Sequence, residues 1–263
     1  SNGKDLDTRD RWGGRVAVRW KPADAVTVDY AYDRIDIDEA PSYPQLTEDF
    51  SGFLGAFANP NRAKEATLSY NLPAAPGTFG INRTNTKVKI DGHALTANWD
   101  VSEALSLKSI TGFRKLNAEE PTDFDGTPIA WADFNADAEL DTFQQEVQAT
   151  GKLFENQISY VLGAFYYEEE GNVVAPGVFG FGTVKQTPSF EMDNDATAFY
   201  AQVEYTPAWL DRLTVGAGAR YTDENRSISN ARLVLNDAIE LMNVDRAKAS
   251  FSNTSPSFFV NYK

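Results

Sequence analysis

The feature that most constrains this chain is a strict alternation of apolar and polar residues in paired segments. Between Leu213 and Tyr221 every second side chain is apolar, and those between them are small, polar or charged. The segment Phe199–Tyr205 alternates in the same way, and residues 207–212 connect the two. A period of two predicts β-strands with one apolar face and one polar face, paired as a hairpin.

The same pattern occurs four times along the chain. Each predicted hairpin has a short turn, and longer polar connections follow it at residues 38–85, 118–138, 171–195 and 227–250. The predicted strands are Gly14–Trp20 with Val26–Ile37, Thr86–Trp99 with Leu105–Asn117, Leu140–Gly151 with Ile158–Glu170, Phe199–Tyr205 with Leu213–Tyr221, and a last strand Phe251–Tyr262. The expected fold is all-β: an antiparallel, up-and-down transmembrane β-barrel segment of about nine strands, with short periplasmic turns and long extracellular loops.

Composition excludes several classes of protein and leaves this one open. The formal net charge of −14 and the lack of basic clusters argue against a nucleic-acid partner. With no cysteine, the chain has no disulfides, no thiolate metal site and no cysteine nucleophile. The mean hydropathy of −0.42 does not argue against a membrane barrel, because only alternate residues of its strands face lipid.

Large aromatic residues lie beside all four short turns. Tryptophan and tyrosine prefer the boundary between lipid and water, where a ring is both apolar and polar. We therefore predict that these aromatics mark one membrane interface. They are Trp20, Trp99, Phe154, Tyr205 and Trp209.

Several segments resemble strands of the TonB-dependent outer-membrane receptor family, in particular its sphingomonad-like branch. They are Leu105–Arg114, Phe143–Gln148, Ala198–Tyr205, Leu213–Thr222 and Phe258–Tyr262. The resemblance implies a bacterial outer-membrane location and a large barrel that encloses a plug domain. It also implies uptake of a scarce nutrient, such as a ferric siderophore, with energy passed through TonB.

No energy-coupling box or plug-like segment is found, so we expect residues 1–263 to be part of the barrel domain only. The expected partners are outer-membrane lipid, the plug, the remaining strands, TonB and a small-molecule ligand. The alternative is a soluble or surface-attached β-sandwich that binds carbohydrate through exposed aromatics.

Two groups of residues are candidates for ligand contact. Arginines that alternate with lipid-facing residues are expected to point into the lumen, where they meet an anionic ligand or acids of the plug; they are Arg15, Arg19, Arg114 and Arg220. Aromatics in the long loops are expected to contact substrate; they are Tyr43, Phe57, Trp131 and Phe179.

Catalysis, cofactors and metals are not expected. The only histidine, His93, lies in a predicted strand without a nucleophile motif. The segment Asp123–Gly126 is similar to the start of a calcium loop, but the later ligands of that loop are not present, so a turn is predicted there. The chain is expected to be a carrier and not an enzyme.

Overall fold

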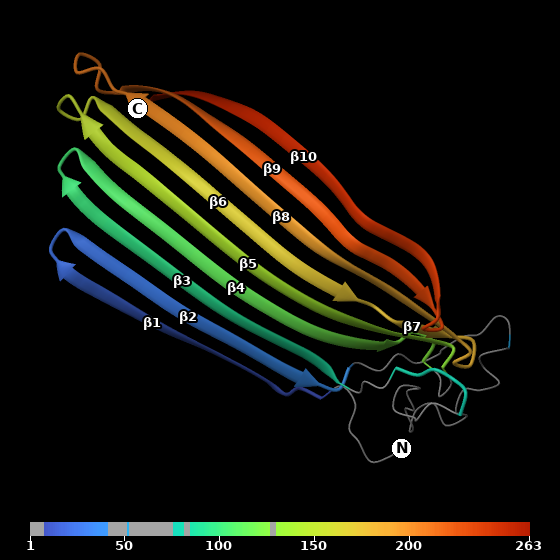
Figure 1. Cartoon of the computed structure of the whole chain (residues 1–263). Coiled ribbons are helices and arrows are strands. Elements are labelled where there is room, and N and C mark those ends of the chain that lie inside the picture. Colours follow the sequence, from blue (N-terminus) through green and yellow to red (C-terminus); the bar gives the residue numbers. More distant parts are fainter. Residues whose placement is uncertain (1–7, 42–51, 53–75, 82–84, 127–129) are drawn as a thin grey trace.

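The computed structural model describes residues 8–41, 52, 76–81, 85–126 and 130–263. These residues form one antiparallel sheet of long strands, shown in Figure 1. The strands are β1 (Arg11–Ala23), β2 (Val26–Glu39), β3 (Thr86–Ser102), β4 (Leu105–Asp123), β5 (Ala132–Leu153), β6 (Ile158–Val174), β7 (Gly177–Phe179), β8 (Val184–Tyr205), β9 (Leu213–Leu235) and β10 (Ile239–Tyr262).

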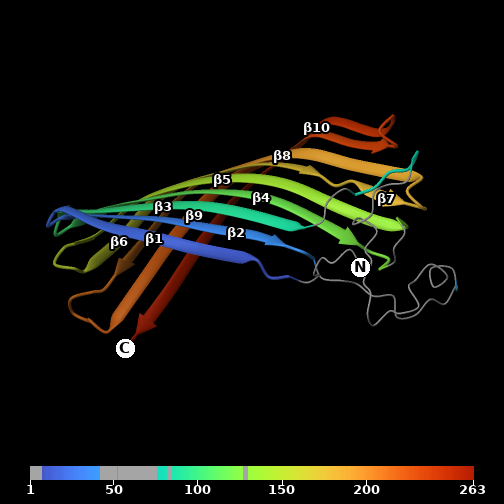
Figure 2. The ribbon, with the colours of Figure 1, turned by 90° about the horizontal axis from the view of Figure 1, so that it is seen from below.

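Nine of these strands pair in chain order, and the three-residue β7 pairs separately with β5 and β8. The order is that of an up-and-down sheet, in which each hairpin places successive strands side by side. Figure 2 shows that the sheet is curved and twisted, so its two edge strands run in different directions. Among the described residues, no helix is long and apolar enough to cross a membrane.

The sheet is a single layer, and the β-sandwich alternative is therefore wrong. A sandwich buries the apolar faces of two sheets against each other. Here the only buried hydrophobic residues in the described part of the chain are Ile81, Val178 and Ala198. Large apolar side chains instead lie exposed along one face of the sheet, for example Val16 at 63% and Phe199 at 58%. A continuous exposed apolar face indicates contact with another apolar phase.

Three connections that the sequence predicted as long loops are mostly strand. The predicted ranges 118–138, 171–195 and 227–250 lie largely inside the extended hairpins. The connections that remain are residues 124–131, 175–176, 180–183 and 236–238. The last of these is a tight turn in which Asn236 and Asp237 have φ values of 52° and 57°, which Asn and Asp tolerate better than most residues. The long connection between β2 and β3 lies mainly outside the described residues.

Candidate functional site

The apolar face of the sheet is bounded by aromatic side chains at the end that carries the short turns. Trp20 is the cross-strand partner of Val28 on β2, and Trp99 is the partner of Val26 on the same strand. Tyr205 ends β8, while Phe154 and Trp209 lie in the turns that follow β5 and β8. All five predicted interface residues are at least 40% exposed.

A second row of rings, which the sequence analysis missed, bounds the same face further along the strands. On each of seven strands we follow the apolar face away from the short turn until the first charged residue on that face. The last large side chain before that charged residue is aromatic or histidine. They are Tyr32, His93, Phe113, Phe143, Tyr166, Phe199 and Tyr221. Rings on adjacent strands approach each other: the centroids of Tyr32 and His93 are 4.9 Å apart, and those of His93 and Phe113 are 6.3 Å apart. His93 therefore belongs to this row, and its Nδ1 lies 2.8 Å from the hydroxyl of Tyr30.

The spacing of the two rows matches a membrane. On β4 the apolar face runs from Leu105 to Phe113, about 26 Å along a strand. On β5 it runs from Leu153 to Phe143, about 33 Å. Strands tilted by roughly 40° would give a band about 20–25 Å tall, close to the height expected for an outer-membrane barrel.

The opposite face of the sheet carries the predicted lumen arginines. The register places Arg15, Arg19, Arg114 and Arg220 all on this face, which we call the inner face. Arg19 Nε donates to Asp29 Oδ1 at 2.6 Å, and Arg114 Nη2 donates to Asp33 Oδ2 at 3.1 Å. At least these two arginines are thus balanced by acids of neighbouring strands.

Arg220 has a different environment on the inner face. Its guanidinium lies 5.7 Å from the ring centroids of both Phe165 and Tyr200. The Tyr200 hydroxyl donates to Glu146 Oε1 at 2.6 Å. This group joins a cation, two rings and a carboxylate across β5, β6, β8 and β9. Such rings hold the planar guanidinium in place through cation–π contact.

A hollow of about 440 Å³ lies beside Arg15 and Arg19, near the short-turn end. Small side chains form its floor, among them Ala17, Ala31 and Ala94. An acidic or polar group that enters the hollow would meet two guanidiniums, of which Arg19 already donates to both carboxylate oxygens of Asp29. The hollow thus combines two guanidiniums with one carboxylate at its edge.

Aromatic rings gather at the other end of the sheet, where β4, β5 and β7 meet. We call this group, Phe124, Trp131, Phe134, Phe179 and Phe181, the aromatic rim. Phe134 packs edge to face against Phe179 at 5.3 Å and against Phe124 at 6.1 Å, and Trp131 packs in the same way against Phe181 at 5.4 Å. Phe124 remains 74% exposed. The predicted contact residues Trp131 and Phe179 thus belong to one group, whereas Tyr43 and Phe57 lie outside the described residues.

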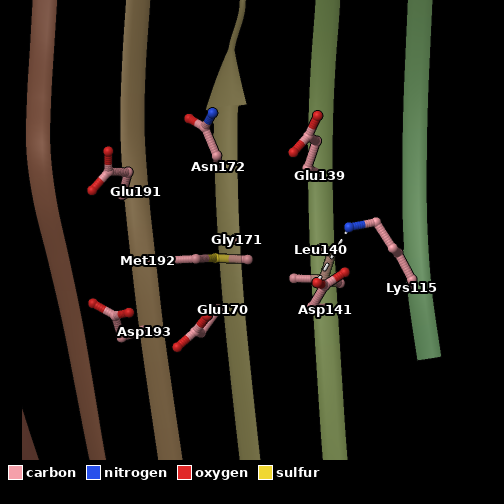
Figure 3. A pocket seen from close by; sticks show the side chains of 10 residues that line it. All are labelled: Lys115, Glu139, Leu140, Asp141, Glu170, Gly171, Asn172, Glu191, Met192 and Asp193. Carbon is pink, nitrogen blue, oxygen red and sulfur yellow. Dashed lines mark hydrogen bonds and ion pairs between the residues drawn. The ribbon is translucent and has the colours of Figure 1, made fainter. Parts of the chain in front are cut away.

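A shallow pocket of about 250 Å³ lies just beyond the second ring row, across β4, β5, β6 and β8 (Figure 3). Most of its lining side chains lie on the same side of the sheet as the apolar face, but closer to the rim. Five of the lining residues are carboxylates. Lys115 Nζ lies 3.4 Å from Asp141 Oδ2, as the dashed line in Figure 3 shows. The change from rings to carboxylates within two residues, from Phe143 to Asp141, marks a sharp end to the apolar band.

Comparison with known protein families identifies the family to which this chain belongs. Residues 29–263 match the family model described as TonB dependent receptor-like, beta-barrel. The chain belongs to the TonB-dependent receptor family. Proteins of this family are outer-membrane β-barrels, and the apolar face of the wall of such a barrel contacts lipid.

Solved structures share the fold at low sequence identity. They include the ferric yersiniabactin uptake receptor FyuA from Yersinia pestis (TM-score 0.66, 14% identity, 98% of this chain and 36% of that one). The siderophore receptor PiuA from Acinetobacter baumannii has a TM-score of 0.60 and 10% identity over 97% of this chain and 40% of its own. The copper transporter OprC has a TM-score of 0.56 and 12% identity over 98% and 35%. No curated protein matches the chain.

The chain therefore spans between a third and two fifths of the length of these structures. At this identity the likeness concerns the fold alone.

Proposed function

We propose that this chain is part of the barrel wall of an outer-membrane receptor that imports a scarce nutrient, such as a ferric siderophore, with energy delivered through TonB. Family membership supports the transport class. The structural neighbours include receptors for ferric yersiniabactin and for a siderophore, but also a copper transporter. A metal complex is therefore the favoured cargo, and its chelator has to be found by experiment.

One observation carries the proposal: an exposed apolar face between two rows of rings, backed by a charged inner face. In water this face would expose Val16, Phe199 and many similar side chains at a large cost. In a bilayer the same face is solvated by lipid, and the inner face borders an enclosed aqueous space.

The proposed partners follow from the edges of the sheet. Among the described strands, β1 pairs only with β2, and β10 pairs only with β9. Unpaired backbone groups cannot remain exposed to hydrocarbon, so further strands would complete the barrel. We propose a plug domain inside it, with acidic or polar groups that meet the hollow beside Arg15 and Arg19.

The proposed ligand contacts are the aromatic rim and the inner-face arginines. The exposed ring of Phe124 and its neighbours offers stacking surfaces for an aromatic chelator. Further inside, Arg220 and Arg114 would attract the negative charge of a ferric complex. The rings lie at the end of the sheet away from the short turns, and the arginines lie deeper on the inner face. This order suits a ligand that first binds to the rings and then moves past the arginines.

The test measures uptake of radiolabelled iron by cells that express the complete receptor and lack other iron receptors. The probes are iron bound to a tris-catecholate chelator and iron bound to citrate. We expect uptake of at least one complex, and its loss when TonB is deleted. Uptake of neither complex would refute these two iron complexes as cargo, and uptake that is unchanged without TonB would refute the energy source.

The Phe124→Ala variant locates the contact. Since its ring is 74% exposed, its removal should leave folding intact and weaken binding of the transported complex several-fold. The matched control is Trp209→Ala, because Trp209 is 80% exposed at the opposite end of the sheet. Equal effects of the two variants would exclude the rim as the contact.

A further inference from the structure

Three aspartates meet behind the aromatic rim. Asp123 ends β4, Asp133 is its cross-strand partner at the start of β5, and Asp125 lies in the connection between them. One carboxylate oxygen from each lies within 4.8 Å of the other two. Their exposed fractions are 1% for Asp123, 9% for Asp125 and 1% for Asp133. Carboxylates so close and so deeply buried are held together best by positive charge.

An apolar cover closes this cluster. On the other side of Asp133, β7 contributes its cross-strand partner Val178, which is 0% exposed. Ile81, Phe79 and Ala130 pack against Val178. The cover keeps bulk water away and so strengthens any charge interaction beneath it.

Backbone groups fix the direction of two of the carboxylates. The amide nitrogen of Gly126 donates to Asp123 Oδ1 at 2.7 Å. The amide nitrogen of Ala132 donates to Asp125 Oδ2 at 2.8 Å. Each bond engages one oxygen of a carboxylate and orients the group, as outer hydrogen bonds orient metal ligands in proteins.

A fourth side chain points to a cation independently of the acids. Asn135 is 3% exposed, and its buried Oδ1 accepts no hydrogen bond in the described part of the chain. It lies two residues after Asp133 on β5, so both side chains project from the same face. Its Nδ2 donates forward along the strand to Asp137 Oδ1 at 2.8 Å, so the amide is held on its nitrogen side while its oxygen, bonded to the same carbon, has no donor. A buried amide oxygen without a donor is costly, and a metal ion would satisfy it.

We propose that Asp123, Asp125, Asp133 and the amide oxygen of Asn135 bind a divalent cation, and that the cation is Ca²⁺. All four donors are oxygens, which hard cations prefer over the nitrogen and sulfur ligands of zinc or copper. Ca²⁺ accepts an irregular set of oxygen ligands, including bidentate carboxylates and water, whereas Mg²⁺ requires a near-ideal octahedron.

The cation would join the ends of β4 and β5 to their connection. That connection carries Phe124 and Trp131 of the aromatic rim, so the metal fixes the position of the rim. The site itself does not depend on what the rim binds. Loss of Ca²⁺ binding and loss of iron uptake are therefore separate results.

The test counts bound Ca²⁺ on the complete receptor, purified in detergent and stripped with a chelator. Equilibrium dialysis with radiolabelled Ca²⁺ compares the wild type with Asp133→Asn, which keeps the shape of the side chain and removes its charge. The control is Asp211→Asn, an exposed acid in the turn before β9. We expect Asp133→Asn to lose one equivalent, or to bind it at least tenfold more weakly, and Asp211→Asn to match the wild type.

A second readout reports on the site directly. Trp131 lies two residues before Asp133, so its fluorescence should change when Ca²⁺ is added to the wild type and not when it is added to Asp133→Asn. Trp131→Phe identifies the contribution of this residue. If Asp133→Asn does not show the heat-modifiable mobility of a folded barrel, Asp125→Asn, in the connection, replaces it. Equal Ca²⁺ stoichiometry in the wild type and a folded variant overturns the proposal, as does a wild type that binds no Ca²⁺.

Discussion

The lipid-facing assignment predicts a large difference between two arginine substitutions that lie side by side. Ala217 lies on the apolar face of β9, midway between Leu213 and Tyr221, and is exposed between Val203 of β8 and Phe258 of β10. Ala217→Arg would place a charge near the middle of the apolar band. An arginine at the bilayer midplane of a barrel costs about 2–4 kcal/mol, which lowers the folding equilibrium constant roughly 30- to 1,000-fold.

The matched control is Ser257→Arg on the neighbouring strand. Ser257 lies one residue before Phe258 on β10, is exposed, and faces the inner side. Its arginine would enter water, so the expected cost is under about 1 kcal/mol. Gly218, which follows Ala217, is a poor control. A side chain there would begin 3.0 Å from the carbonyl oxygen of Ala201, so steric strain would obscure the charge effect.

The assay is reversible denaturant unfolding of the complete receptor in lipid vesicles of defined composition, followed by tryptophan fluorescence. A third variant, Leu213→Arg, at the edge of the band, should cost only about 0–1 kcal/mol because charge is tolerated near the interface. The reasoning is refuted if Ala217→Arg and Ser257→Arg cost the same, or if Leu213→Arg costs more than Ala217→Arg.

Three further predictions concern the inner face. Gly163→Ala should cost about 1–3 kcal/mol in the same assay, since its Cβ would lie 2.1 Å from Cζ of Tyr200; a similar cost in a Tyr200→Ala background would contradict this cause. Tyr200→Phe removes the hydrogen bond to Glu146 and should lower stability by about 1.5–3 kcal/mol, and no change in unfolding would show that the bond is replaced by water. A double-mutant cycle of Arg19→Ala and Asp29→Ala should give a coupling of only about 0.2–1 kcal/mol, because the pair is exposed; a value above 2 kcal/mol would indicate an enclosed pair.

The membrane-embedded half of the fold could be predicted from the sequence because lipid imposes the alternation directly. Between Leu213 and Tyr221 each second residue has to be apolar, and the pattern alone located the strand. Beyond Tyr221 the same strand continues to Leu235, but Asp223, Asn225 and Ser227 replace the apolar residues. This outer part of the strand has water on both sides, so neither of its faces needs apolar side chains. The alternation of apolar and polar residues therefore disappears there, and the sequence predicted loops instead of strands.

The second row of rings could not be found from spacing along the chain. Tyr32, His93 and Phe113 lie far apart in sequence and far from the short turns. Only the register of β2, β3 and β4 places them beside one another. The sequence does contain a signal for this row. Each ring lies two residues from a charged residue on the same face of its strand, namely Arg34, Asp91 and Lys115.

The aspartate cluster was missed for a related reason. The sequence predicted a turn at Asp123–Gly126, which agrees with the hydrogen bond from Gly126. The sequence predicted a loop at Asp133, and a residue in a loop has no cross-strand partner, whereas in the structure Asp133 pairs with Asp123. An extended β4–β5 hairpin would have brought the two carboxylates together, and the error in strand length therefore concealed the site.

The most direct test of the whole account is the accessibility of single cysteines along β9. Residues 1–263 contain no cysteine, so a cysteine introduced between positions 213 and 221 is the only labelling site in this part of the receptor, and any cysteine elsewhere in the receptor is first replaced by serine. In the complete receptor in bilayers, we expect labels at odd positions to be relaxed by oxygen, which concentrates in lipid, and labels at even positions by a water-soluble nickel chelate. Labels on both sides of the strand should become accessible to the chelate beyond Tyr221. An accessibility profile without this period of two, or one with the opposite phase, would contradict the claim that this face of the wall contacts lipid.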